Sequence, residues 1–164
     1  GIGEIGMDFY WFEKNKTPYT ERERAKDYQE RLFRAQLQLA SERNLPVSIH
    51  SRNAEELCVQ IASEYDVTGF FHSFTGNYNI ATKIIDHGFG IGVNGIATYP
   101  SGKPIRDMLR KIIGDNKINE PQDLYCKSIF LETDAPYLTP GNKRNIKNEP
   151  KNVREIFTYL QNKL

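Results

Sequence analysis

The sequence Gly1-Ile-Gly-Glu-Ile-Gly-Met-Asp8 reads as a β-strand that ends on a carboxylate. Three later stretches share this design, because each runs a few apolar residues into a side chain that can bind a metal ion. These stretches cover residues 46–50, 67–72 and 129–134. The four predicted strands therefore offer four candidate metal ligands, which are Glu4, His50, His72 and Asp134.

Helical patterns separate the predicted strands. The clearest runs from Thr20 to about Asn44, where apolar residues recur at steps of three and four. This apolar stripe consists of Ala25, Tyr28, Leu32, Ala35 and Leu39. A second helix is expected after Asn53 as its cap, and further helices over about 79–87 and 104–113. The remaining segments predict a strand over 89–93 and surface loops over 10–18 and 114–128.

Strands that alternate with helices predict a parallel sheet covered by helices. Parallel strands with polar side chains at their carboxyl ends fit either an open doubly wound sheet or a TIM (β/α)8 barrel. Gly1, Gly3 and Gly6 imitate part of a dinucleotide-binding motif, but no helical pattern follows them directly. Ligands that converge from several separate strands fit the barrel better, so we expect an α/β fold of the TIM-barrel type.

Length and composition set further limits. The 164 residues suit one domain, which we expect to cover residues 1–164. Because 22 Lys and Arg face 21 Asp and Glu, the overall charge gives no attraction to nucleic acid or to a membrane. Cys58 and Cys126 favour free thiols in a reducing cytosol, and no apolar run approaches the about 20 residues of a membrane span. We therefore expect a cytoplasmic protein without a membrane partner.

The candidate ligands combine two kinds of donor atom. His50 and His72 offer imidazole nitrogens, whereas Glu4 and Asp134 offer carboxylate oxygens that can bridge ions or orient a water. This mixture suits Zn, Mn or Mg in a hydrolase, with Asp134 placed to take the proton of an activated water. Each residue alone also has a structural explanation, because a histidine can be hydrogen-bonded within the fold and a carboxylate can cap a loop. Four such residues at successive strand ends favour a site.

Longer motifs around these residues resemble one family. They are Gly3-Glu-Ile-Gly-Met-Asp-Phe-Tyr10, Ile49-His-Ser-Arg52, Phe71-His-Ser-Phe-Thr-Gly76 and Leu131-Glu-Thr-Asp-Ala-Pro-Tyr-Leu-Thr-Pro140. Their sequence, order and spacing resemble the signatures of the TatD family of metal-dependent deoxyribonucleases. Residues 143–150 look like the Arg-Asn-Glu-Pro segment of that family with two extra residues inside it.

The resemblance implies an amidohydrolase-like TIM barrel that cleaves phosphodiester bonds in DNA with two divalent ions (Mg, Mn or Zn), often as a 3′ exonuclease. By this resemblance Glu4 bridges the two ions, His50 and His72 complete the ligands of one ion, and Asp134 holds the other and activates water. Arg52 and Arg144 are candidate substrate-binding residues, since a guanidinium group binds phosphate well. Each also has a structural alternative, a salt bridge at a helix start for Arg52 and a solvated loop for Arg144.

Members of that family begin with a strand that carries His-X-His, which this sequence does not show. A TIM barrel has eight strands and about 250 residues, so we expect the chain to be N-terminally incomplete and to hold strands four to eight. The complete protein is expected to be a monomer that acts on DNA. Two other functions stay open, which are a metal-dependent amide or lactone hydrolase and a non-catalytic truncated barrel. Aromatic residues near loops, among them Phe9, Tyr10 and Trp11, either stack bases or pack those loops.

Overall fold

The computed structural model describes residues 1–141, 143 and 146–164 of the chain. They form two compact units, which we call unit 1 (residues 1–72 and 86–89) and unit 2 (residues 73–85 and 90–164). Strands alternate with helices in both units, as the sequence predicts, so the fold is α/β. None of the helices in these described residues combines the length and the apolar composition that a bilayer crossing requires.

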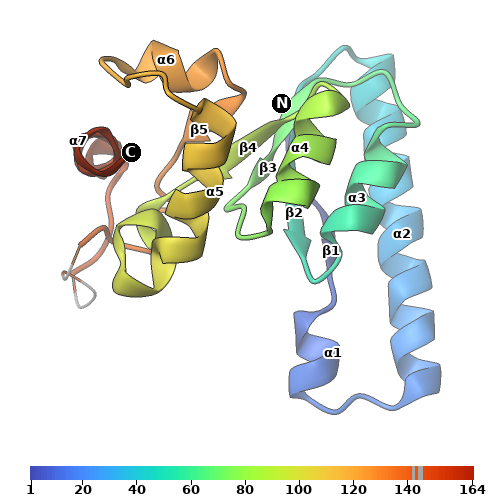
Figure 1. The fold of residues 1–164 in the computed structure, drawn as a ribbon. Coiled ribbons are helices and arrows are strands. Elements are labelled where there is room, and N and C mark those ends of the chain that lie inside the picture. The colour runs from blue at the N-terminus through green and yellow to red at the C-terminus, as the bar shows by residue number, and fades with distance from the viewer. Residues whose placement is uncertain (142, 144–145) are drawn as a thin grey trace. The chain divides into compact units, whose positions relative to one another are not determined.

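Unit 1 is a three-stranded parallel sheet whose long helices pack on one face (Figure 1). Its middle strand, β2, pairs with β1 on one side and with β3 on the other. The helices α2 and α3 contact β1 and β2. The elements are β1 (Ile2–Asp8), α1 (Tyr10–Lys14), α2 (Tyr19–Glu42), β2 (Val47–Arg52), α3 (Glu55–Ala62) and β3 (Gly69–His72).

Alternation along the strands gives this sheet two different faces. Ile5, Ile49 and Phe71 are fully or almost fully buried and belong to the core. Their neighbours in sequence point to the opposite face, because successive side chains of a strand alternate between faces. His50 and His72 occupy that opposite face at directly paired positions of β2 and β3. The helices therefore cover one apolar face, and the two histidines lie on the other.

The helix predicted from Thr20 forms as α2, but the apolar stripe seen in its sequence is not its buried face. Tyr28 and Leu32 are 64% and 48% exposed, whereas Phe33 and Leu37 are fully buried. Both sets of residues have helical spacing, so periodicity alone does not choose between them. The rotation that buries Phe33 and Leu37 also brings Gln29 to β1, where its amide side chain accepts from the backbone N–H of Asp8 and donates to its carbonyl oxygen.

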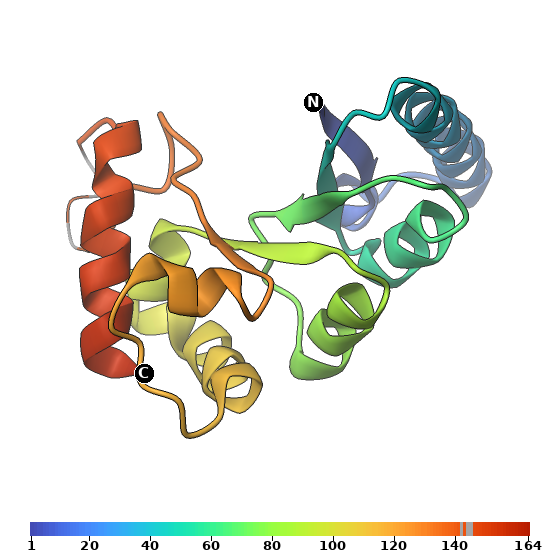
Figure 2. The same ribbon diagram turned by 90° about the horizontal axis from the view of Figure 1, so that it is seen from above.

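Unit 2 is built around a parallel pair of short strands with helices packed beside them. In Figure 2, α7 (red) runs beside the part of the chain that holds α5 and α6. Buried side chains of α5 and α7, such as Leu109 and Ile156, form the core with Ile129 of the strand pair. The elements are α4 (Tyr78–Asp86), β4 (Gly90–Val93), η1 (Gly95–Thr98), η2 (Pro100–Gly102), α5 (Lys103–Ile113), α6 (Pro121–Tyr125), β5 (Ile129–Leu131), η3 (Pro150–Asn152) and α7 (Val153–Lys163).

Two segments predicted as loops contain short helices. In the segment 114–128, Glu120 and Asp123 form a reciprocal capping box and Pro121 occupies the first turn, so α6 forms despite its polar surroundings. In the segment 10–18, α1 forms from residues that bury no side chain. Neither helix carries the long apolar periodicity on which the sequence prediction depends.

Two expected boundaries also differ from the structure. Asn53 does not cap α3, because Ala54 holds the cap position and Asn53 adopts a positive φ of 56°. The strand expected over 129–134 ends at Leu131, so Asp134 lies in the loop that follows β5. Asp134 has a φ of 57°, a left-handed conformation that an extended strand does not contain.

Candidate metal centre

The carboxylate of Glu4 stands between two imidazole rings in unit 1. Its Oε2 lies 3.8 Å from Nδ1 of His50, and its Oε1 lies 3.8 Å from Nε2 of His72. His72 is almost covered, with 10% of its side chain exposed, while 53% of the Glu4 side chain is open to solvent. The three residues come from three neighbouring strands, so the sheet itself brings them together.

These separations suit donors that share a divalent ion. Two atoms bound to one ion at about 2.2 Å each can lie at most about 4.4 Å apart, and both donor pairs fall inside that limit. The separations are too long for strong hydrogen bonds, so Glu4 is not simply engaged by its two neighbours. Two nitrogens and a carboxylate also match the donors that Zn and Mn accept. Glu4 therefore forms two donor pairs that each suit a divalent ion, one with His50 through Oε2 and one with His72 through Oε1.

Asp8 also belongs to this cluster. From the sequence it was not identified as a metal ligand or as a hydrogen-bond partner of one. Its Oδ2 lies 3.3 Å from Nε2 of His50, on the ring edge opposite the one that faces Glu4. Its Oδ1 accepts a hydrogen bond from the backbone N–H of Tyr10 at 2.9 Å. Its position in the sequence could have indicated this role, because Asp8 ends the same strand that carries Glu4. A carboxylate behind a histidine ligand fixes the orientation of the ring.

Gly6 lets β1 approach β2 close to the candidate ligand His50. It pairs with His50 in the sheet and has a φ of 136°, which L side chains rarely adopt. A Cβ at this position would collide with the backbone carbonyl oxygen of His50. The glycine is thus required both by its backbone conformation and by the close contact with the strand that carries His50.

Asp134 lies in unit 2, in a loop that hydrogen bonds hold in shape. Its backbone carbonyl accepts from the N–H of Tyr137 at 2.8 Å. The buried amide of Asn148 donates to the carbonyl oxygens of Thr133 and Tyr137, on both sides of Asp134. The neighbouring Glu132 accepts a hydrogen bond from the backbone N–H of Ser73, the residue after His72. This network fixes the loop and identifies Asn148 as the residue that organises it.

The two predicted substrate-binding arginines have different outcomes. The guanidinium of Arg52 lies over the ring of Tyr10, 3.5 Å from the ring centroid, which is a stacking contact rather than the salt bridge considered from the sequence. Arg144 lies outside the described residues. Phosphate binding by either residue stays a prediction.

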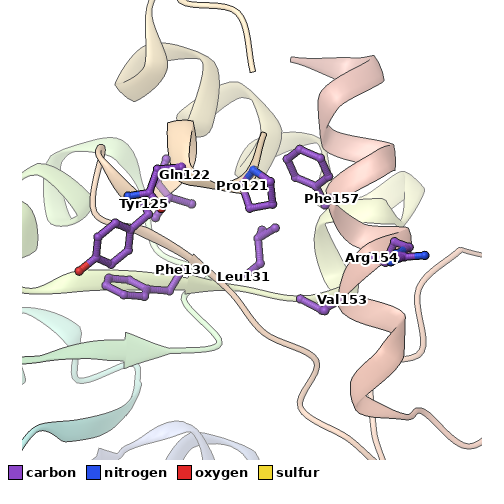
Figure 3. Close-up of a pocket in the computed structure, with 9 residues that line it drawn as sticks. Pro121, Gln122, Tyr125, Phe130, Leu131, Val153, Arg154 and Phe157 are labelled. Atoms are coloured by element: carbon purple, nitrogen blue, oxygen red, sulfur yellow. The ribbon is translucent and has the colours of Figure 1, made fainter. Parts of the chain in front are cut away.

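Unit 2 also contains an apolar hollow of about 470 Å³ between α6, β5 and α7 (Figure 3). Tyr125, Phe130 and Phe157 supply much of its lining, with Arg154 as the charged residue. None of the candidate ligands lines it. Its lining is mainly apolar and thus differs in character from the face of unit 1 that carries the histidines.

Comparison with known proteins gives one consistent family. Residues 1–163 match the family described as TatD related DNase. The chain is 34% identical over 158 residues to the uncharacterized metal-dependent hydrolase YabD of Bacillus subtilis (strain 168), covering 94% of this chain and 53% of that protein. It is 36% identical over 163 residues to the 3′-5′ ssDNA/RNA exonuclease TatD of Rahnella sp. (strain Y9602), covering 97% of this chain and 52% of that protein.

The fold has solved counterparts as well. The crystal structure of YjjV, a TatD homolog from Escherichia coli K12, superposes with a TM-score of 0.75 at 27% identity, over 98% of this chain and 54% of that one. A TatD family hydrolase from Entamoeba histolytica shares the fold with a TM-score of 0.67 at 20% identity. These likenesses bear out the expected α/β fold, consistent with part of a TIM barrel. The chain spans about half the length of the curated relatives it matches.

Proposed function

The chain belongs to the family of TatD related DNases, and from this premise we propose that its protein hydrolyses phosphodiester bonds in DNA with the help of divalent metal. The observation that carries the proposal is the position of Glu4 between His50 and His72 on one face of a parallel sheet. The name of the Rahnella relative, an exonuclease of single-stranded DNA and RNA, supports nucleic acid as the substrate. Cleavage from the 3′ end is part of the same proposal.

The roles of the residues follow from their chemistry and from the family resemblance. Glu4, His50 and His72 supply the carboxylate oxygens and imidazole nitrogens that hold metal, and Asp134 is proposed as the further ligand and proton acceptor. When bound, a divalent ion lowers the pKa of a water molecule and neutralises charge on a phosphoryl oxygen. Asp8 positions the ring of His50 through its contact with Nε2.

The proposed reaction is an ordinary hydrolysis. The oxygen of water forms a bond to phosphorus, and the bond between phosphorus and the leaving oxygen breaks. Asp134 takes the proton of the attacking water, and the leaving oxygen takes a proton from solvent to become a hydroxyl group. Arg52 is proposed to contact the substrate phosphate, because stacking on Tyr10 uses the face of its guanidinium and leaves the N–H edge for an anion. Arg144 is proposed for the same role from the sequence motif alone.

The test is a cleavage assay on labelled single-stranded DNA with Mg, Mn or Zn and with a chelator. We expect metal-dependent release of nucleotides that is lost in Glu4→Gln and Asp134→Asn and kept in the control Asp27→Asn. Asp27 is a suitable control because its carboxylate pairs with Arg31 on the surface of α2. Cleavage of an amide or lactone panel without action on DNA would support the other hydrolase function instead. Metal binding without turnover of any substrate would support the non-catalytic alternative.

A further inference from the structure

The short helix α1 carries large aromatic side chains that the core does not use. Three of its five residues are aromatic, and none of the five is buried. Trp11 has 47% of its surface exposed. Large aromatic rings bury much area when they join a core, so their position outside it calls for another explanation. We use the name aromatic–basic cluster for Tyr10, Trp11, Lys14 and Arg52.

Positive charge lies directly against these rings. The ammonium of Lys14 is 4.6 Å from the centroid of the Trp11 ring and 5.7 Å from that of Tyr10. The guanidinium of Arg52 is 3.5 Å from the centroid of the Tyr10 ring. The two rings meet edge to face, with their centroids 5.3 Å apart. The cluster thus combines π surfaces with two cations inside one small area.

Hydrogen bonds tie this cluster to the strand ends that carry the candidate metal ligands. The backbone N–H of Tyr10 donates to the carboxylate of Asp8, whose other oxygen lies 3.3 Å from His50. The backbone N–H of Phe9 donates to the carbonyl oxygen of Arg52 at 2.8 Å. All of these residues belong to unit 1. The start of α1 is therefore held at the carboxyl ends of β1 and β2.

We propose that the aromatic–basic cluster stacks an unpaired base of a single-stranded nucleic acid beside the metal ligands, an inference that rests on the proposed function. Every base has a π face that can stack on an aromatic ring, whatever the sequence. Lys14 and Arg52 supply the positive charge that attracts the phosphates on either side of that base. Bases in a duplex are already stacked on both faces, so the cluster selects single strands.

Neighbouring residues agree with this use. Phe9 and Phe12 stack on each other with centroids 5.8 Å apart, and Lys26 lies 5.2 Å from the Phe9 ring, so these two rings are engaged with other side chains. Trp11 is left as the large exposed ring. The acidic side chain of the helix, Glu13, accepts a hydrogen bond from the amide of Asn53. This contact engages its carboxylate with another part of the chain.

Tryptophan fluorescence provides a direct test, because Trp11 is the single tryptophan of the chain. The 164-residue chain is titrated in a chelator, so that no cleavage occurs, with a single-stranded oligodeoxynucleotide. The same strand with abasic sites and the matching duplex serve as comparison probes. We expect saturable quenching by the single strand and about 10-fold weaker binding of the abasic strand and the duplex. Equal binding of the abasic strand, or binding with unchanged Trp11 fluorescence, overturns the proposal.

Variants test the same point with a label on the oligonucleotide. By fluorescence anisotropy, Trp11→Ala is expected to weaken binding of the single strand about 10-fold, and Trp11→Phe to keep it within about 3-fold. Tyr28→Ala is the matched control, since Tyr28 is an exposed aromatic residue on α2 of the same unit and is expected to leave binding unchanged. Wild-type affinity in Trp11→Ala overturns the proposal, as does a chain that binds none of the probes.

The stacking proposal and the nuclease proposal can fail independently of each other. A chain that quenches with single strands but cleaves nothing when metal is added keeps the stacking site and loses the nuclease proposal. A chain that cleaves DNA with metal, and whose KM for the single strand is the same in Trp11→Ala, keeps the nuclease proposal and loses the stacking site. A KM raised about 10-fold with little change in kcat is the expected result for a ring that only binds substrate.

Discussion

Nε2 of His50 lies 3.3 Å from Oδ2 of Asp8. Since Nδ1 of the same ring faces Glu4, the imidazole stands between two carboxylates that have different roles. Asp8 contacts the ring at Nε2, and Glu4 faces it at Nδ1, where metal binding is proposed. This relationship makes Asp8 a positioning residue and gives the first prediction.

Asp8→Ala is expected to weaken the binding of Zn or Mn about 10- to 100-fold, because partners behind a metal-binding histidine typically contribute that much. Isothermal titration of the purified chain with each metal measures the effect. Asp27→Ala is the control, because Asp27 pairs with Arg31 on α2 and contacts none of the candidate ligands. Equal metal affinity in Asp8→Ala and the wild type would contradict the assigned role of Asp8.

Gly6→Ala is expected to destabilise the chain by more than about 1 kcal/mol, since alanine is strained at positive φ. Here the new Cβ also collides with the carbonyl oxygen of His50. Gly88→Ala separates the two causes, because Gly88 has a φ of 83° and its added Cβ meets no atom within 4 Å. Urea unfolding should place the loss for Gly6→Ala clearly above that for Gly88→Ala. Equal losses would mean that β1 can move away from β2 without cost.

Asn148→Ala is expected to lower the free energy of unfolding by about 1 to 3 kcal/mol, because two carbonyl oxygens lose their shared donor in a buried setting. Those carbonyls belong to Thr133 and Tyr137, which flank Asp134. The loss is measured by urea unfolding beside Asn162→Ala, whose amide donates to a carbonyl within the exposed part of α7. If the two variants unfold alike, Asn148 does not hold the loop.

Burial raises the pKa of the Cys58 thiol to about 12. At pH 8 this thiol is almost entirely protonated, so iodoacetamide should modify the exposed Cys126 and leave Cys58 intact. Mass spectrometry of the alkylated peptides reads the result. Similar rates at both cysteines would show that Cys58 is reached by solvent in the native chain.

The same shift has a defined effect on stability. Below about pH 9 the thiol is neutral in both the folded and the unfolded chain, and its contribution is fully present. As pH rises from about 9 toward 12, the thiol ionises mainly in the unfolded chain, so stability falls with rising pH over this range. Cys58→Ala should remove this part of the alkaline loss. Identical alkaline unfolding curves for the variant and the wild type would contradict the shift.

Strand positions and the face shared by the histidines could be predicted from the sequence. Short apolar runs that end in His50 and His72 gave the strands, and the parallel pairing places both residues side by side. The helix before Pro46 and the strands around residues 90–93 and 129–131 also agree with the structure. In each case the prediction rests on local periodicity and on glycine or proline at the boundaries, which act over a few residues.

Other features depend on contacts between distant residues, which a single sequence does not display. The rotation of α2 is tied to contacts with β1 and the core, among them the hydrogen bonds between Gln29 and Asp8, 21 positions apart. The role of Asn148 follows from its bonds to carbonyl groups 11 and 15 positions away. The helix α1 has only five residues, too few for its pattern to show. Contacts that are not visible in a local pattern thus determine the features that periodicity leaves open.

Along β2, Val47 and Ile49 alternate with side chains that point to the other face, so the pairing register of this strand also decides where His50 lies. A slip of β2 by one residue would turn His50 toward the helices and Ile49 toward the opposite face, because side chains of a strand alternate. A misaligned chain would lose its hydrophobic core and its histidine pair in one event. Uptake of metal by this chain would therefore report that the strands have found their native register, and a pool of misfolded molecules could be recognised by its failure to retain the ion.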